Sequence, residues 1–281
     1  MKAEASSLIT PYGGQLVNLL ESSQEIEKLK VFGENLPSIQ ISERLACDLE
    51  LLATGAFSPL EGFMGQEDFQ RVLDEMRLVS GCVFPMPIIL PVSPSPDIQL
   101  DKQIALRSLK NDLLAVLTIE EIYEWDVREF SEKVLLTQDF RHPMVSSIHR
   151  WGRVNISGNL QVIQLPHRSD FQDIRFSPAQ TRQHLSQLDR SNIVAFQTRN
   201  PLHRVHEELT KRAIRKHDAA LLLHPVVGMT KSGDVDHYTR VRTYKAMISN
   251  YYKNESVMLA LLPLAMRLAG PREALWHALI R

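Results

Sequence analysis

Histidine, arginine and amide side chains gather in one short segment, residues 197–206. Arg199 carries a planar guanidinium that fits the oxygens of phosphate or sulfate. His203 and His206 are three residues apart, so on a helix they share one face about 5–6 Å from each other. The segment also contains the polar side chains of Gln197, Thr198 and Asn200. This combination predicts a binding site for a polyanion.

A strand that runs directly into a helix is the predicted scaffold of this segment. Residues 193–196 form a short apolar run, typical of a strand that is covered on both faces. Asn200 and Pro201 are typical of a helix start, because Asn caps free amides and Pro suits the first helical position. A helix start also attracts anions through its partial positive charge. We expect the helix to run to about residue 216 with an apolar stripe made of Val205, Leu209 and Ala213.

Two other interpretations of this segment are weaker. An Asn-Pro helix cap is common and the histidines could be surface residues, but all these features within ten residues at a strand end favour a functional site. Paired histidines can also bind zinc. A third ligand is not evident nearby, and Arg199 would repel a cation. We therefore expect no protein-bound metal.

Composition sets limits on the class of protein. The chain has 281 residues with a formal net charge of −1, so it has no bulk bias toward nucleic acid or anionic membranes. Cys47 and Cys82 are interpreted as reduced, buried thiols of a cytoplasmic protein. Residues 1–20 lack a signal-peptide pattern, and the apolar segment 257–266 is too short to span a membrane. We expect neither a nucleic-acid partner nor a membrane partner.

The first half of the chain, to about residue 162, has short apolar runs broken by turn residues. A central strand is predicted at 113–119, and the prolines within 83–92 predict an edge strand or a strand end. Further strands are predicted at 103–109 and 160–165, and helices at 41–54, 67–75 and 137–142. This pattern favours a small mixed β domain of a barrel-like kind.

Strands and helices alternate in the second half. Ser177 and Pro178 predict a helix that runs to about residue 188. Strands are predicted at 192–197, 219–225 and 257–262, and further helices at 236–250 and from 270 to 281. Alternation of this kind predicts a parallel sheet with its ligand site beyond the carboxyl ends of the strands. Segments 198–206 and 224–234 both fall there.

The segment 228–234 and the helix after it carry further candidates. Lys231 could reach a phosphate, or Gly233 and Asp234 could form a turn, with Asp234 or Asp236 capping the helix. The sequence leaves these two interpretations open. The stripe of this helix contains Tyr238, Val241 and Tyr244. Arg240 and Arg242 are interpreted as surface residues of the helix and not as ligands, although Arg240 lies near the expected cleft.

Residues 197–206, Gln-Thr-Arg-Asn-Pro-Leu-His-Arg-Val-His, resemble the signature of the ATP sulfurylase (sulfate adenylyltransferase) family. Segments 48–64, 165–178, 224–234 and 262–274 resemble other parts of the family in the same order. The resemblance implies a PUA-like β-barrel domain at 1–168. It implies an α/β Rossmann-like nucleotidyltransferase domain of the HUP type at 169–281. Neither of the two commonest phosphate-binding glycine loops occurs in the chain, so the nucleotide must be held differently.

The implied activity is transfer of the adenylyl group of ATP to sulfate, which gives adenylyl sulfate and pyrophosphate. By resemblance, Arg199 and Gln197 hold sulfate, and Thr198 and Asn200 contact the nucleotide phosphates. Thr198, Arg199 and Asn200 form the implied catalytic set. His203 and His206 orient the triphosphate and stabilise the transition state. Mg²⁺ is expected to arrive with ATP, and the resemblance leaves room for a homo-oligomer.

The resemblance stops before a Gly-Arg-Asp-His segment that the family carries on a further strand, because that segment does not occur here. We therefore expect a chain truncated at its carboxyl end with an incomplete second domain. Two other functions stay open: an adenylyltransferase with a different acceptor, and a non-catalytic fragment that binds nucleotide or RNA. The sulfate-specific triplet 197–199 argues against the first, and the near-neutral charge argues against RNA.

Overall fold

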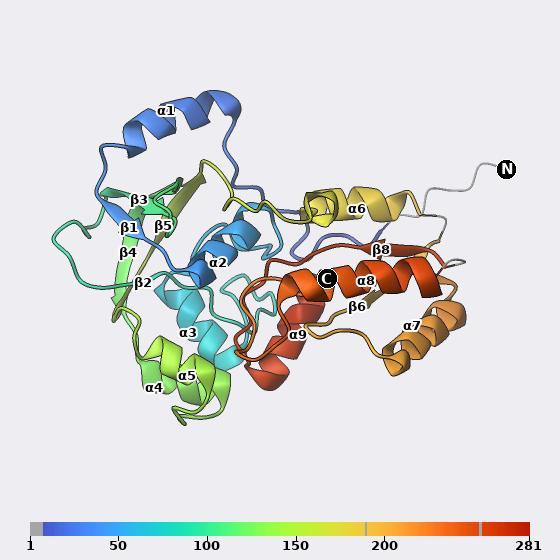
Figure 1. Ribbon diagram of the computed structural model, residues 1–281. Helices are drawn as coiled ribbons and strands as arrows, with labels where there is room; N and C mark the ends of the chain where they lie inside the picture. The colour runs from blue at the N-terminus through green and yellow to red at the C-terminus, as the bar shows by residue number, and fades with distance from the viewer. Residues whose placement is uncertain (1–7, 189, 253–254) are drawn as a thin grey trace. The chain divides into compact units, whose positions relative to one another are not determined.

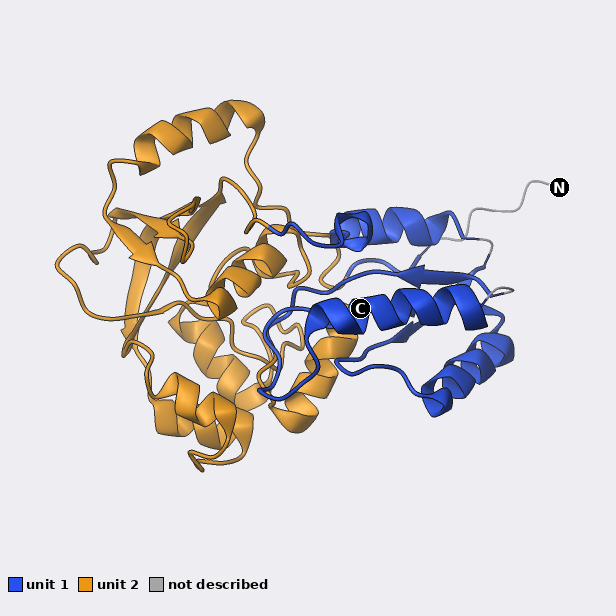
Figure 2. Cartoon of the chain, in the orientation of Figure 1, with its two compact units in different colours: residues 1–11, 168–265 blue, residues 12–167, 266–281 orange. Residues whose placement is uncertain are grey.

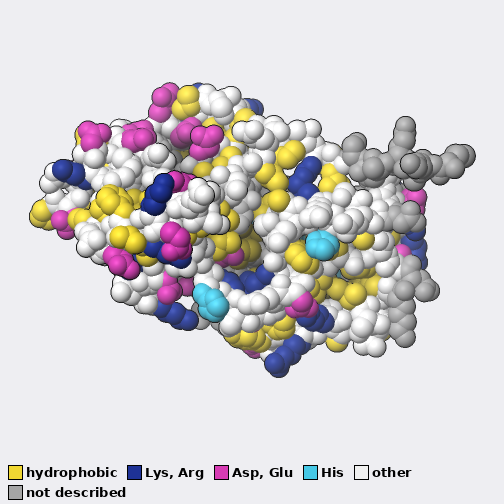
Figure 3. Space-filling view, turned by 90° about the horizontal axis from the view of Figure 1, so that it is seen from above, with side chains coloured by type: hydrophobic (Ala, Val, Ile, Leu, Met, Phe, Trp, Pro, Cys, Tyr) yellow, Lys and Arg dark blue, Asp and Glu magenta, His cyan; other side chains and the backbone are white. Residues whose placement is uncertain are grey.

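A computed structural model describes residues 8–188, 190–252 and 255–281 of the chain. Contacts divide the chain into two compact units (Figure 2). Unit 1 comprises Met1–Pro11 and Arg168–Ala265, and unit 2 comprises Tyr12–His167 and Met266–Arg281. On the face drawn in Figure 3, acidic and basic side chains are interspersed, in keeping with the net charge of −1. Among the described residues, no helix has the length and apolar character needed to cross a membrane.

Unit 2 is built on a mixed five-stranded sheet (Figure 1). Its strands are β1 (Ser38–Gln40), β2 (Pro91–Val92), β3 (Gln103–Arg107), β4 (Leu113–Glu124) and β5 (Val154–Val162). Their order is β1-β3-β4-β5-β2, in which β1 runs parallel to β3 and the other pairs are antiparallel. The predicted central position of the strand from Leu113 is confirmed, because β4 pairs on both sides and its first five residues are buried.

Unit 2 also contains helices. They are α1 (Ser23–Gly33), α2 (Glu43–Ala53), α3 (Gln66–Glu75), α4 (Val127–Phe130), a π-helix (Ser131–Leu135), α5 (Pro143–Ile148) and α9 (Gly270–Ile280). The helices predicted at 41–54 and 67–75 are confirmed as α2 and α3. Ser42 fixes the start of α2, because its hydroxyl accepts from Leu45 N.

Three predictions for unit 2 need correction. In the segment 83–92 the predicted edge position is confirmed, because β2 ends the sheet, but the strand is shorter than predicted. Only Pro91–Val92 pairs as a strand, since Pro85 and Pro87 lack the N–H that a ladder needs. Residues 137–142 are not helical, because the side chains of Thr137 and Asp139 accept from nearby backbone amides and hold turns instead. Strand β5 begins six residues before the predicted 160. Its polar residues Asn155 and Ser157 are buried, so the first part of the strand lacks the apolar pattern from which a strand is predicted.

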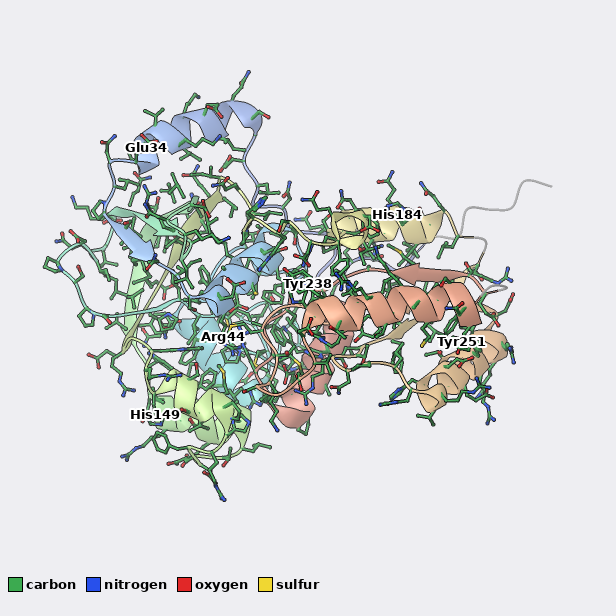
Figure 4. The ribbon with its side chains drawn as sticks, viewed as in Figure 1. Glu34, Arg44, His149, His184, Tyr238 and Tyr251 are labelled. Carbon is green, nitrogen blue, oxygen red and sulfur yellow. The ribbon has the colours of Figure 1, made fainter. Side chains whose placement is uncertain are left out.

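The segment from Met266 to the end packs into unit 2. The Nη2 of Arg267 lies 2.5 Å from Asp48 Oδ2, and both side chains are almost fully buried. Arg44, labelled on α2 in Figure 4, donates from Nη1 to Met266 O at 2.7 Å. Arg272 donates to Val72 O and Leu73 O near the end of α3 at 2.9 and 2.8 Å. A salt bridge and hydrogen bonds thus tie the segment that leads into α9 to α2, and hydrogen bonds tie α9 itself to α3. Trp276 of α9 adds an aromatic contact, because its ring centroid lies 5.1 Å from that of Phe57.

Both cysteines are free thiols, as expected. Cys47 is buried in α2, whereas Cys82 is only partly buried, so the expectation of two buried thiols holds for Cys47 alone.

Unit 1 contains the predicted parallel sheet. Its strands β6 (Asn192–Phe196), β7 (Ala219–Leu223) and β8 (Val257–Leu259) lie in the order β6-β7-β8, all parallel. The helices are α6 (Pro178–Ser186), α7 (Arg204–His217) and α8 (His237–Tyr251), with a short 3₁₀ turn at Gln172–Ile174. Ser177 caps α6 as predicted, and Gln180 completes the capping box.

The helices of unit 1 cover both faces of this sheet. On one face, Leu221 and Leu223 of β7 pack with Ile214 of α7 and with Val241 and Tyr244 of α8. On the other face, Leu222 of β7 and Met258 of β8 pack against Leu185 of α6. Side chains of β7 alternate between the two layers, as the pleat of a strand requires. This three-layer arrangement explains why β7 is buried along its whole length while carrying no polar residue.

Candidate functional site

The connections that follow β6 and β7 lie side by side at the carboxyl ends of their strands. Beyond the strands themselves, His224 N donates to Phe196 O and Val226 N donates to Thr198 O, both at 2.9 Å. The pairing between the two chain segments therefore continues past the strands. The segments 198–206 and 224–234 thus lie at one edge of the sheet, as predicted.

The helix that carries the histidines starts later than predicted. Helix α7 begins at Arg204 with His203 as its N-cap, so the predicted start at Pro201 with Asn200 as the cap is wrong. Residues before it are held in a tight turn instead, because Thr198 Oγ1 accepts from Asn200 N at 3.1 Å. The carbonyl of Asn200 accepts from Thr198 Oγ1 at 2.9 Å and from Tyr244 Oη at 2.7 Å. These bonds prevent residues 198–200 from joining the helix.

The two histidines lie next to each other at the start of α7. Their ring centroids are 5.7 Å apart, which agrees with the predicted separation. His206 Nδ1 accepts a hydrogen bond from His203 N at 3.0 Å. A neutral His206 therefore carries its ring proton on Nε2, which leaves that nitrogen as a donor. His203 is exposed and His206 is half-buried.

Arg199 reaches from the first connection to the second. Its Nη1 lies 3.4 Å from Asp234 Oδ2, and the two side chains are only 27% and 12% exposed. Nη1 is buried and has no hydrogen-bond partner among the residues that the structure describes. A largely desolvated guanidinium with a donor still to be satisfied is suited to an anion. Gln197 and Thr198, beside it at the end of β6, are half-buried, and Asn200 is exposed.

The structure of the second connection shows which of the two aspartates, Asp234 or Asp236, caps α8. Asp236 is the N-cap, since its carboxylate accepts from Thr239 N at 2.9 Å. Asp234 instead closes a turn: its Oδ2 accepts from Lys231 N at 3.1 Å, and its own N donates to Lys231 O. Gly233 supplies the positive φ of 89° that this turn needs. The turn interpretation is therefore confirmed, and the phosphate role of Lys231 stays a prediction.

Gly228 begins this connection in close contact with the segment after β8. A Cβ at this position would lie 2.3 Å from Leu264 O. Only glycine allows the two backbones to approach so closely.

Two side chains of α8, those of Arg240 and Tyr244, donate to backbone carbonyls of the two connections, a role that the sequence pattern did not predict. Arg240 is 2% exposed, so the interpretation of Arg240 as a surface residue is wrong; Arg242 is exposed as expected. Tyr244 is fully buried, and burial raises the pKa of its hydroxyl. Tyr238, labelled in Figure 4, is 47% exposed although it belongs to the predicted stripe. The four-residue spacing of Arg240 and Tyr244 on one helix face is the signal that could have linked them.

The predicted apolar stripe of α7 does not face the core. Val205 and Leu209 are 69% and 57% exposed, and the residues of α7 that are buried are Glu207, Thr210 and Ile214. Thr210 Oγ1 lies 2.6 Å from Tyr252 Oη, and Glu207 pairs with Lys211 at 2.7 Å, so polar contacts accompany the apolar packing of Ile214 on the buried face. Strand β6 is likewise only partly covered, with Ala195 exposed.

Anion binding is the chemistry that this arrangement supports. One strand-to-helix connection carries a guanidinium, two imidazoles, an amide and a hydroxyl, and a helix begins within it. In the described part of the chain, no three His, Cys, Asp or Glu side chains are grouped as a metal site requires. The site thus offers donors for the oxygens of anions.

Comparisons with known proteins agree on the family. A model of the PUA-like domain matches residues 9–165, and a model of ATP-sulfurylase matches residues 172–281. Sulfate adenylyltransferase from Neurospora crassa is 46% identical over 278 residues, which are 96% of this chain and 48% of that protein. The protein of the same name from Schizosaccharomyces pombe is 47% identical over 260 residues, which are 91% of this chain and 53% of that protein. The chain thus spans about half the length of the curated relatives it matches.

Solved structures resemble this chain as well, and one of them matches nearly its whole length. It is the hexameric APS kinase from Thiobacillus denitrificans, which superposes with a TM-score of 0.80 at 30% sequence identity. The match covers 97% of this chain and 50% of that one. A PUA-like domain followed by an α/β nucleotide-binding domain is therefore the fold of this chain.

Proposed function

The chain belongs to the ATP-sulfurylase family, and we propose from this premise that it catalyses sulfate activation. The reaction transfers the adenylyl group of ATP to sulfate and releases pyrophosphate. It is the entry step of sulfate assimilation in chemical terms, because it converts an unreactive anion into a mixed anhydride.

The observation that carries this proposal is the state of Arg199. Sulfate is fully deprotonated at neutral pH, so it needs a cationic cradle and no general base. The buried Nη1 of Arg199, left without a hydrogen-bond partner among the described residues, provides a donor for such an oxyanion. Gln197 precedes it by two residues at the end of β6 and supplies an amide for the same anion.

The reaction joins two anions, and this fixes what the protein must do. A sulfate oxygen forms a bond to the α-phosphorus of ATP, and the bond from that phosphorus to the bridging oxygen breaks. Pyrophosphate leaves with the electron pair of the broken bond. Catalysis consists of aligning the two anions and of stabilising the charge on the equatorial and leaving oxygens.

The remaining site residues suit the nucleotide. Thr198 and Asn200 offer a hydroxyl and an amide to the phosphates. His203 and His206 offer imidazoles at the start of α7, and the Nε2–H of a neutral His206 can donate to a charged oxygen. These donors would stabilise the transition state and the leaving pyrophosphate.

Mg²⁺ belongs to the substrate in this proposal. The only carboxylate that contacts Arg199, that of Asp234, is already engaged with the guanidinium and with Lys231 N, as far as the described residues go. A site of this composition fits a cation that enters bound to the triphosphate.

Synthesis of ATP from adenylyl sulfate and pyrophosphate tests the proposal, because this direction is downhill. We expect the chain to form ATP, Arg199→Ala to abolish turnover, and Arg242→Ala, an exposed arginine of α8, to retain it. Circular dichroism must show both variants folded. A folded Arg199→Ala variant with substantial turnover would refute the role of Arg199, and a folded wild-type chain without turnover would refute the activity itself.

The proposal extends to assembly. The matched APS kinase is hexameric, and we propose that this chain forms a homo-oligomer too. Light scattering during gel filtration would give its mass, and a mass near 32.1 kDa would contradict this part of the proposal.

A further inference from the structure

Two side chains of α8 contact the backbone of both connections that form the site. They are Arg240 and Tyr244, one helical turn apart. Both are almost fully buried, and both use their polar ends on main-chain carbonyls. Neither belongs to the residues proposed to touch substrate.

Tyr244 holds the first connection. Its hydroxyl donates to Asn200 O at 2.7 Å, and it also interacts with the side chain of Thr198. The turn at 198–200 is thus held from inside its own segment by Thr198 Oγ1 and from α8 by Tyr244. Arg199 lies between the two residues that Tyr244 contacts, so the path of the backbone at Arg199 depends on this hydroxyl.

Arg240 holds the second connection. Its Nη1 donates to Val226 O and its Nε donates to Val235 O, each at 2.8 Å. These carbonyls stand at the start and the end of the segment that contains Asp234. One guanidinium therefore fixes both ends of the segment that carries the Asp234 carboxylate facing Arg199.

The two supports are coupled to each other. Val226, which accepts from Arg240, also donates from its N to Thr198 O at 2.9 Å. The Arg240 guanidinium interacts with the Tyr244 hydroxyl as well. A displacement of one connection is therefore transmitted to the other through contacts between named atoms.

We propose that Arg240 and Tyr244 are positioning residues that set Arg199 and the turn at Asp234 for binding the anionic substrate, an inference that rests on the proposed function. A buried arginine is costly unless its donors are satisfied. An apolar side chain would fill the same place in the core between α8 and the sheet. The specific gain from arginine is that its planar fork reaches two carbonyls at once, which lysine cannot do.

The substitution Tyr244→Phe removes one hydroxyl and keeps the ring. Tyr252→Phe is the matched control, because it also removes a buried hydroxyl of unit 1, one that contacts Thr210 and neither connection. We expect both variants to fold and to lose comparable stability. The ATP-formation rates of the two variants are compared at a temperature well below both unfolding midpoints. If the Tyr244 hydroxyl only stabilised the fold, the two rates would be equal.

We expect kcat/KM for ATP formation to fall about tenfold or more in Tyr244→Phe, since a small displacement of binding groups is costly to a transition state. It should stay within about twofold of wild type in Tyr252→Phe. Arg240→Lys should lose activity although it keeps the charge, because one ammonium cannot reach both carbonyls. Equal rates in wild type and Tyr244→Phe, or equal losses in the two tyrosine variants, would overturn the inference.

A second measurement separates this inference from the proposed activity. Inorganic sulfate should raise the unfolding midpoint of the wild-type chain through binding, and the rise should be smaller in Tyr244→Phe than in Tyr252→Phe. A wild-type chain without turnover would refute the proposed activity. The rise of the unfolding midpoint with sulfate would then be the only test of the positioning role. The positioning role is overturned if sulfate raises the unfolding midpoint equally in both variants or does not raise it in the wild-type chain.

Discussion

Arg199 and Asp234 form an ion pair between the two connections of the site, with Nη1 and Oδ2 3.4 Å apart. The pair is loose, because this separation exceeds a good hydrogen bond and leaves the Nη1 donor unsatisfied. Asp234 supplies the charge that compensates the guanidinium before an anion arrives. A sulfate that binds as we propose must therefore share Arg199 with a carboxylate or displace it.

Substitution of Asp234 by Asn tests this competition. Asn keeps an oxygen that can accept from Lys231 N, so the turn at residues 231–234 should persist. Loss of the negative charge should tighten sulfate binding about fivefold, which corresponds to about 1 kcal/mol for a partly exposed ion pair. Isothermal titration with sulfate measures the effect. Weaker binding in the variant would instead show that Asp234 orients Arg199 more than it opposes the anion.

His206 has a structural role and a proposed chemical role, and two substitutions separate them. In His206→Gln the amide can still accept from His203 N, because glutamine at this position completes a capping box. His206→Ala loses this bond and should lower the free energy of unfolding by about 1 kcal/mol. Both variants should lose turnover about a hundredfold, since both remove the imidazole. Urea unfolding and ATP-formation rates check the two effects, and retained turnover in His206→Gln would exclude the chemical role.

Gly228 is the position where an added methyl group should disturb the site without touching its polar residues. Gly228→Ala places a Cβ 2.3 Å from Leu264 O, so one backbone segment must move. Overpacking of this kind costs about 1–3 kcal/mol. Gly62→Ala is a suitable control, because its Cβ would meet only ordinary contacts, the nearest at 3.4 Å. Thermal unfolding with both variants measures the difference, and equal midpoints would show that the segment at Leu264 yields easily.

Asp170 should make unit 1 sensitive to acid. Burial alone would raise the pKa of this carboxyl. The hydrogen bond and charge of Arg175, then the backbone of Asp170 itself and His237, outweigh burial and hold the pKa below its ordinary value of 3.8. A lowered folded-state pKa contributes stability that is present above the unfolded value and is lost as the pH falls through the folded value. Asp170→Asn should therefore unfold at lower urea than wild type at pH 7, with a gap that narrows below about pH 4. A gap that is constant with pH would refute the assignment.

Local signals in the sequence were sufficient for much of unit 1. Apolar runs and capping residues predicted the strands, α6 and α8 within a few residues, because these signals act over three or four positions. Topology alone predicted that the segments 198–206 and 224–234 meet, since the carboxyl ends of parallel strands lie at one edge. Helix α6 is the clearest case, with Ser177 and Gln180 bonded as the pattern requires.

Features decided by distant contacts were not predictable in this way. Asn200 was a plausible cap, but its carbonyl bonds to Tyr244, 44 residues later, and α7 starts at Arg204. The packed face of α7 was misjudged because Thr210 is buried through a bond to Tyr252, while Leu209 is exposed. Bonds from side chains to remote backbone leave no periodic trace in the sequence, and Arg240 was missed for the same reason.

The division of unit 2 into two stretches of chain has a consequence for its synthesis on the ribosome. Residues 12–167 emerge first, but Arg267, Arg272 and Trp276 emerge only after the whole of Arg168–Ala265. Until then Asp48 lacks its partner Arg267, and the ring of Phe57 lacks the indole it packs against. The core of unit 2 therefore stays incomplete until residues 266–281 have been synthesised. At this stage the nascent chain should depend most on chaperones.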